Sequence, residues 1–182
     1  MTWYDDATGE RVELSVATAA NWAAKTANLL AEDDIEAVRL DPAWHWLATV
    51  VALGAWTAGV PVGDEGEPLP GDPQQFIARV LPQPDALVIA PPLPDDQALA
   101  MQGRIWTLEE LGVAAGQAAA QHRLEPGARV MSTLPLDTVV GIDAGLLVPL
   151  AAGGSVVLVA HADESKLARR VEDERVSQRL PR

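Results

Sequence analysis

The spacing of apolar residues predicts helices that alternate with short strands along most of the chain. Apolar side chains recur at helical spacing through residues 15–32. This segment starts at Ser15, a residue type that commonly caps a helix N-terminus. Apolar runs of strand length follow at 35–40 and 60–62, and the same pattern places later strands at 128–133 and 155–160.

Short motifs predict where other helices begin. An acid followed by proline suits the N-cap and the first helical position, and a Thr-x-x-Glu pattern is typical of a capping box. A further helix is expected over 138–152, and an amphipathic one runs to about residue 176. The starting residues are Asp41-Pro42, Asp72-Pro73, Thr107 with Glu110, and Asp163.

Residues 86–90 form an uninterrupted apolar run, as expected of a strand that is buried on both faces. The first fifteen residues read as two short extended pieces around a Gly9 turn. The Pro-, Gly- and Asp-rich stretches 63–71 and 91–102 are predicted to be loops. Together these elements predict an α/β fold: a mainly parallel sheet flanked by helices on both faces, with a short N-terminal β-hairpin.

The chain is long enough for one α/β domain over residues 1–182. A helix, a glycine and a strand recur at 53–62 and 147–157, which suggests weak internal halves at 1–94 and 103–182. Any α/β protein repeats such units, so ordinary α/β architecture is the preferred explanation of this similarity.

Two long uncharged runs, 47–63 and 144–160, are each shorter than the roughly 18–20 residues that a membrane-spanning helix needs. The first residues show neither a basic region nor an apolar region of a targeting signal. We therefore expect a cytoplasmic protein that has no membrane partner.

The chain is acidic, with a formal net charge of −13, and it has no cysteine. Such a charge repels phosphate backbones, so a nucleic-acid partner is not expected. Disulfides, thiolate metal sites and cysteine nucleophiles are excluded. Only two lysines are present, Lys25 and Lys166, so lysine-dependent chemistry has few candidates.

No glycine-rich phosphate loop and no nucleophile elbow occurs in the sequence, and the three histidines share no motif. We therefore predict no catalytic residue, no cofactor and no metal site. His161, Asp163 and Glu164 follow a predicted strand, at the end where α/β proteins keep their sites. The alternative is a helix cap beside a surface histidine. The pair Asp5 and Asp6 falls in a turn and is interpreted as solvated.

The chain has six tryptophans against one Phe and one Tyr. Core packing explains most of them. Trp44 and Trp46 are two positions apart, however, and cannot face the same side of a helix. At least one of them is expected to face a ligand or partner, and a homodimer that uses these tryptophans is the predicted assembly.

The order of several short motifs resembles the N-terminal subdomain of adenylate-forming enzymes, the AMP-binding superfamily that includes acyl-CoA synthetases and acyl-AMP ligases. The motifs are Trp3-Tyr-Asp-Asp-x-x-x-Gly9, Val12-Glu-Leu-Ser15, Leu53-Gly-Ala-Trp-Thr-Ala-Gly-Val-Pro-Val62, Pro126-Gly-Ala-Arg-Val130, and Gly141 through Leu158. The resemblance covers nearly the whole chain. It implies the superfamily's α/β fold.

The departures from this family concern its chemistry. Its Ser/Thr/Gly-rich phosphate loop, which carries a lysine, belongs between Val88 and Thr107, where this chain has Ala90-Pro-Pro-Leu-Pro-Asp-Asp96. The family often has an aromatic and a His where this chain has Asp137-Thr138. If the old acyl cleft still binds a ligand, the resemblance places Pro135, Asp137, Thr138 and Gly141 there.

These departures predict a non-catalytic relative, a pseudoenzyme that acts by binding or assembly. One alternative is a partner subunit that completes a split acyl-adenylating enzyme, in which case ligase activity needs a second chain. The other alternative is a protein that binds a small acyl or carboxylate ligand.

Overall fold

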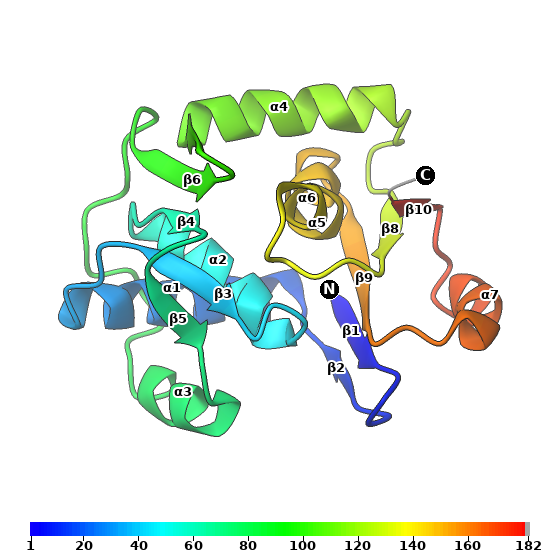
Figure 1. The fold of residues 1–182 in the computed structure, drawn as a ribbon, viewed down its shortest axis with the longest axis horizontal. Coiled ribbons are helices and arrows are strands. Elements are labelled where there is room, and N and C mark those ends of the chain that lie inside the picture. Colours follow the sequence, from blue (N-terminus) through cyan, green and yellow to red (C-terminus); the bar gives the residue numbers. More distant parts are fainter. Residues whose placement is uncertain (181–182) are drawn as a thin grey trace. The chain divides into compact units, whose positions relative to one another are not determined.

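The computed structural model describes residues 1–180 and divides the chain into two compact units (Figure 1). The first unit contains residues 1–14 together with the chain from Gly112 onward, and the second contains Ser15–Leu111. Helix α4 (Leu108–Gln121) crosses the boundary between them. Each unit has its own sheet, so each is described by itself.

The first unit is built on a five-stranded sheet in the order β10-β8-β9-β1-β2. Neighbouring strands are parallel except β1 and β2, which form the predicted N-terminal hairpin. The strands are β1 (Thr2–Asp5), β2 (Arg11–Glu13), β8 (Arg129–Ser132), β9 (Ser155–Ala160) and β10 (Gln178–Leu180).

The helix predicted over 138–152 forms, but its middle is a π-helical turn. It consists of α5 (Val139–Ile142), the π-turn η1 (Asp143–Leu147) and α6 (Val148–Ala151). The last helix, α7 (Glu164–Asp173), is capped by the side chain of Asp163, as predicted. Two clusters of buried residues include side chains of this sheet. One contains Val130 and Val148, and the other contains Met131 and Leu167.

The second unit contains a five-stranded sheet in the order β5-β3-β4-β6-β7. Its pairs are parallel except β6 with β7. The strands are β3 (Val38–Asp41), β4 (Val62–Gly63), β5 (Glu67–Pro70), β6 (Gln97–Met101) and β7 (Arg104–Thr107). The predicted α/β class is therefore confirmed, and its strands are shared between two mostly parallel sheets.

Three helices lie wholly within the second unit: α1 (Val16–Glu32), α2 (Trp46–Thr57) and α3 (Pro73–Val80). The predicted caps at Ser15 and Asp72 are confirmed, because each side chain accepts a backbone N–H of the first turn. Thr107 and Glu110 form the predicted capping box at α4 through reciprocal bonds of 3.2 and 3.0 Å. Local cap chemistry thus sets three helix starts correctly.

The helix start predicted at Asp41-Pro42 is wrong. Asp41 ends β3, the Asp41–Pro42 peptide bond is cis, and a turn separates it from α2. The N-cap is His45, whose Nδ1 accepts the N–H of Leu47 at 3.2 Å. Asp41 therefore ends the strand and Pro42 lies in the turn that follows, and neither residue begins the helix.

The strand predicted at residues 86–90 is also wrong, because this segment is irregular and the side chain of Val88 is 68% exposed. Its backbone is held by buried Asn28, which donates to the carbonyls of Pro84 and Ala86 and accepts the N–H of Val88. An apolar run becomes a buried strand only where other strands flank it, and no strand of residues 1–180 does so here.

The stretches predicted as loops contain strands. β5 lies within 63–71 and forms one edge of its sheet, where Pro68 and Pro70 are tolerated because an edge strand needs fewer N–H donors. β6 lies within 91–102 and is paired on both sides. The prolines and acidic residues of these two segments are typical of loops, so the sequence pattern predicted neither strand.

Candidate functional site

Most of the residues expected to hold a ligand in the first unit contact one another. Thr138 caps α5 by accepting the N–H of Gly141 at 3.0 Å. A Cβ on Gly141 would lie 1.8 Å from the carbonyl oxygen of Pro135, so α5 rests directly on that carbonyl. Asp137 is exposed in the connection before the helix. The structure therefore brings Pro135, Thr138 and Gly141 together, through the Pro135 carbonyl and the Thr138 hydroxyl. The ligand role of all four residues stays a prediction.

Asp143 is a candidate functional residue that the sequence argument missed. It begins the π-turn and is half-buried, and its carboxylate makes no hydrogen bond or ion pair with residues 1–180. Burial raises the pKa of Asp143 above its usual value. Its sequence signal was weak, a single acid directly before the long uncharged run at 144–160.

A polar cluster lies where the carboxyl ends of the parallel strands β1 and β9 meet. Asp5 ends β1, and its Oδ1 lies 2.9 Å from Nδ1 of His161, which follows β9 with a positive φ of 48°. Asp6 lies beside them, with only 4% of its side chain exposed. The interpretation of Asp5 and Asp6 as solvated turn residues is therefore wrong, since the parallel pairing buries both.

The hydrogen-bond donors around Asp5 and Asp6 determine the direction in which their pKa values shift. Burial alone would raise the pKa of Asp5, but hydrogen bonds from His161 and the N–H of Ala7 outweigh it and hold the pKa below its usual value. The pKa of Asp6 is lowered mainly by Arg170, against burial. The acidic pair is therefore charged at neutral pH.

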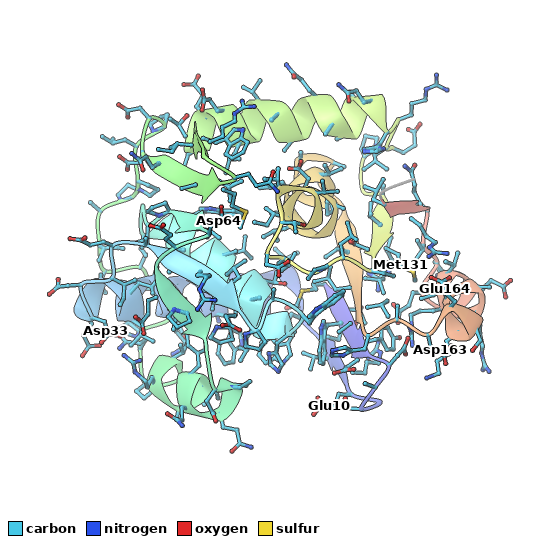
Figure 2. The ribbon with its side chains drawn as sticks, viewed as in Figure 1. Glu10, Asp33, Asp64, Met131, Asp163 and Glu164 are labelled. Carbon is cyan, nitrogen blue, oxygen red and sulfur yellow. The ribbon has the colours of Figure 1, made fainter. Side chains whose placement is uncertain are left out.

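The region around α7 is tied to the same acids. The N–H of Asp163 donates to Asp6 Oδ2 at 2.9 Å, while the Asp163 side chain caps α7. Glu164 is exposed at the start of that helix (Figure 2). His161 and Asp163 thus contact Asp5 and Asp6, respectively. Glu164 instead lies 3.8 Å from Arg179, and the three residues do not form the single cluster that their spacing suggested.

A second network joins the hairpin to the last helix. Glu174 accepts hydrogen bonds from the hydroxyl of Tyr4 and from Arg129, and Arg11 lies 3.3 Å away. Burial opposes the charge on Glu174, but these three donors together lower its pKa. Arg129 also donates to Thr2 at 2.8 Å.

A surface cavity of about 430 Å³ lies beside this network, and its cations are already paired. Its charged lining is Lys166, Arg169, Arg170 and Asp173. Lys166 and Arg170 contact Asp6, and Arg169 lies 3.3 Å from Asp173. These contacts neutralise the cations, so the cluster stabilises the unit instead of presenting an anion site.

The segment between Val88 and Thr107, where the resemblance places a phosphate loop, contains no lysine. Asp96 closes the turn there by accepting the N–H of Leu93 at 2.8 Å. The two lysines lie elsewhere, and both are held locally. Lys25 contacts Asp85 at 3.1 Å and the carbonyl of Leu81, and Lys166 lies 3.5 Å from the Asp163 carboxylate.

The second unit has a larger cavity, of about 530 Å³, with an acidic lining. Glu36, Asp64 and Glu65 surround it, together with Arg104 and Ile105 from β7 (Figure 2 labels Asp64). Its charge favours a cationic ligand group over an anionic one. Among the described residues, no group of three His, Cys, Asp or Glu side chains is arranged to hold a metal ion.

The tryptophans proposed for an interface have different surroundings. Trp46, at the start of α2, packs edge-to-face on Trp22 with ring centroids 5.4 Å apart. Trp44 lies in the preceding turn and is 37% exposed. Of the pair, Trp44 is the better placed to meet a partner. Residues 1–180 include no helix with the length and apolarity needed to cross a bilayer.

The fold is that of the N-terminal domains of acyl-CoA synthetases and related adenylate-forming enzymes. The N-terminal domain of FACL13 from Mycobacterium tuberculosis matches 96% of this chain with a TM-score of 0.70 and 14% identity. MatB from Rhodopseudomonas palustris matches 94% with a TM-score of 0.75 and 16% identity. The Brucella canis acyl-CoA synthetase matches 98%, with a TM-score of 0.75 and 15% identity.

The chain spans only part of these solved relatives: 56% of the FACL13 domain structure and 44% of the MatB and Brucella chains. By sequence it belongs to the TIGR03089 protein family. A TIGR03089 family protein of Mycobacterium tuberculosis is 34% identical in an alignment that is 230 residues long. The alignment covers 99% of this chain and 90% of the relative. No protein-family model matches the chain.

Proposed function

We propose that this chain is a non-catalytic member of the adenylate-forming fold group that works by binding or assembly. The observation that carries the proposal is the position of its only two lysines. Lys25 and Lys166 are both held by local partners, and neither lies in the segment between Val88 and Thr107.

The charge of that segment supports the same conclusion. Asp95 and Asp96 stand where a nucleotide-binding relative needs groups that attract phosphate. Carboxylates repel a triphosphate, and the chain as a whole carries a net charge of −13. The residues that the resemblance assigns to an acyl cleft also support a non-catalytic role. Gly141 of α5 packs directly on the carbonyl of Pro135, so these two residues already fill the space between them.

The test is ATP–pyrophosphate exchange by the purified chain across a panel of carboxylic and fatty acids. An active acyl-CoA synthetase serves as the positive control under the same conditions. We expect exchange no greater than in a blank reaction. Robust exchange by the chain alone would overturn the proposal.

A second candidate is a partner subunit that completes an acyl-adenylating enzyme. It is favoured by the shared fold of adenylate-forming N-terminal domains together with a segment between Val88 and Thr107 that has no lysine, a group that a second chain would have to supply. A tagged chain, recovered from its native cell, should then bring down one partner protein in constant proportion. Mixing the two should produce pyrophosphate exchange that neither shows alone.

We further propose that the chain works in the cytoplasm as a homodimer in which Trp44 lies at the interface. Its exposure at the turn before α2 supports this, because exposed aromatic residues are common anchors of interfaces. Light scattering at micromolar concentration should give twice the chain mass. Trp44→Ala should shift the chain towards the monomer, whereas Val16→Ala, at an exposed residue that we place outside the interface, should not.

A further inference from the structure

The connection between α3 and β6 contains a short segment whose backbone is confined by proline (Figure 1). Three of residues 90–94 are prolines, and each proline ring fixes φ at about −65°. Ala90, Pro91 and Leu93 each precede a proline, which keeps them in the extended region. These restrictions define the polyproline II helix, which has about three residues per turn and no internal hydrogen bonds.

The exposure of the side chains in this segment repeats with the same period. Ile89 and Pro92 are half-buried, whereas the five other side chains of residues 88–94 are exposed. Val88 is 68% exposed and Leu93 is 61% exposed. A Cβ on Gly59 would lie 3.5 Å from the Cβ of Pro92, so Pro92 faces its own unit. One edge of the polyproline II helix therefore contacts the unit, and the other two edges face solvent.

Both ends of the segment are held by hydrogen bonds. At one end, the N–H of Val88 donates to Oδ1 of the buried Asn28 at 3.0 Å. At the other end, the N–H of Glu109 donates to the carbonyl of Pro94 at 2.9 Å. The segment is therefore ordered before any partner binds. A ligand that is ordered in advance loses less conformational entropy on binding.

We propose that residues 88–94 are a docking segment that a partner protein binds in the polyproline II conformation. The partner presents a groove lined with aromatic side chains, which is the surface that recognises such helices. Pro91 and Pro94 lie three positions apart on one exposed edge and enter the groove, while Leu93 on the other exposed edge adds contact area. The inference rests on the proposed binding role and names the class of partner.

The chemistry of the segment selects this occupant. A partner strand cannot pair along residues 90–94, because three of them lack the N–H that strand pairing uses. Asp95 follows the segment directly and is exposed, so a cation beside the aromatic groove complements it. A basic partner is thus favoured over a second copy of this chain, whose net charge is −13.

The test uses a purified basic WW domain as the probe, because WW domains bind polyproline II helices in an aromatic-lined groove. The domain is titrated with the full chain and with a synthetic peptide of residues 86–97, and calorimetry measures both affinities. We expect the full chain to bind at least about threefold tighter than the peptide, since the fold orders the segment. Asp95→Asn should weaken binding by about threefold at low salt and have little effect at about 500 mM salt.

Matched variants remove two prolines from different places. Pro91→Ala with Pro94→Ala should weaken binding by about tenfold or more, because one exposed edge loses both of its rings. The control, Pro82→Ala with Pro126→Ala, removes two exposed prolines outside the segment and should leave the affinity within about twofold. All four prolines are exposed, so the two variants should lose a similar, small amount of stability. Leu93→Ala keeps every proline and should weaken binding by about threefold.

Any of three results would overturn the inference. The WW domain could fail to bind the full chain, whether or not it binds the peptide. The Pro91 and Pro94 variant could bind as tightly as the control variant. Light scattering could show self-association that only the Pro91 and Pro94 variant loses, which would assign the segment to a second copy. Exchange assays on the same preparation test the non-catalytic role separately.

Discussion

Asp6 and Arg170 form a bidentate ion pair between the end of β1 and α7. Arg170 Nη2 donates to Asp6 Oδ1 at 2.8 Å and Nη1 donates to Oδ2 at 3.1 Å. Only 4% of the Asp6 side chain and 11% of the Arg170 side chain are exposed. The guanidinium also lies over the Tyr4 ring, 4.1 Å from its centroid. A charge pair this buried tolerates the loss of neither partner.

Asp6→Asn should therefore destabilise the first unit strongly. The variant leaves the Arg170 guanidinium buried without its counter-charge, which costs about 3 kcal/mol. Urea unfolding followed by circular dichroism measures the loss. Asp173→Asn removes the exposed pair with Arg169 and should cost less than about 0.5 kcal/mol. Equal losses in the two variants would contradict the assignment of a buried pair.

Stability should fall in acid because of the same carboxylates. The pKa values of Asp5, Asp6 and Glu174 are lowered in the folded chain. Their contribution is complete above the unfolded pKa of about 4 and is lost as pH falls through the lower folded values. The free energy of unfolding, measured from pH 7 to pH 2, should decline below about pH 5. Asp6→Asn should make that decline less steep. An unchanged slope would contradict a contribution of Asp6 to the pH dependence.

Gly141→Ala should damage the first unit, because the added Cβ would lie 1.8 Å from the carbonyl oxygen of Pro135. We expect a loss of about 3 kcal/mol or more in the free energy of unfolding. Gly112→Ala is the matched control, since nothing lies within 4 Å of its Cβ and it sits in α4. It should stabilise by up to about 1 kcal/mol, because alanine favours helix. Thermal unfolding of both variants tests this; a neutral Gly141→Ala would show that the contact relaxes.

Asp143→Asn should have the opposite sign to Asp6→Asn at neutral pH. Burial raises the pKa of Asp143, so its charged form costs stability above that raised value. The amide removes the charge and should raise the melting temperature at pH 7 by no more than about 2 °C, because the group is only half-buried. Near pH 3 the difference should vanish, because both states then carry the neutral acid. A melting temperature that drops at pH 7 would reveal a partner for the carboxylate.

Cap chemistry is the part of the fold that the sequence predicted best. Ser15, Asp72, Thr107 and Asp163 cap the helices that they were expected to cap. Each of these interactions joins residues at most three positions apart, so the local sequence contains both partners. The exception is Asp41, where the strand pairing of β3 and the turn before His45 replace the expected helix start.

The acidic groups show what the local sequence could not reveal. Asp6 reaches Arg170 across 164 residues, and Asp5 reaches His161 across 156. Their burial depends on the parallel pairing of β1 with β9, which brings the first and last parts of the chain together. From the local sequence alone, Asp5 and Asp6 cannot be distinguished from solvated turn residues.

The sequence by itself determined the α/β class, most helix starts and the likeness to adenylate-forming enzymes, because these depend on periodicity, caps and the order of short motifs. Tertiary structure alone decided which apolar runs are buried and which acids are paired. Residues 86–90 are apolar enough for a central strand, yet they lack flanking strands and are held by Asn28. Burial and pairing are properties of neighbours distant in the chain, so they appear only once the sheets have formed.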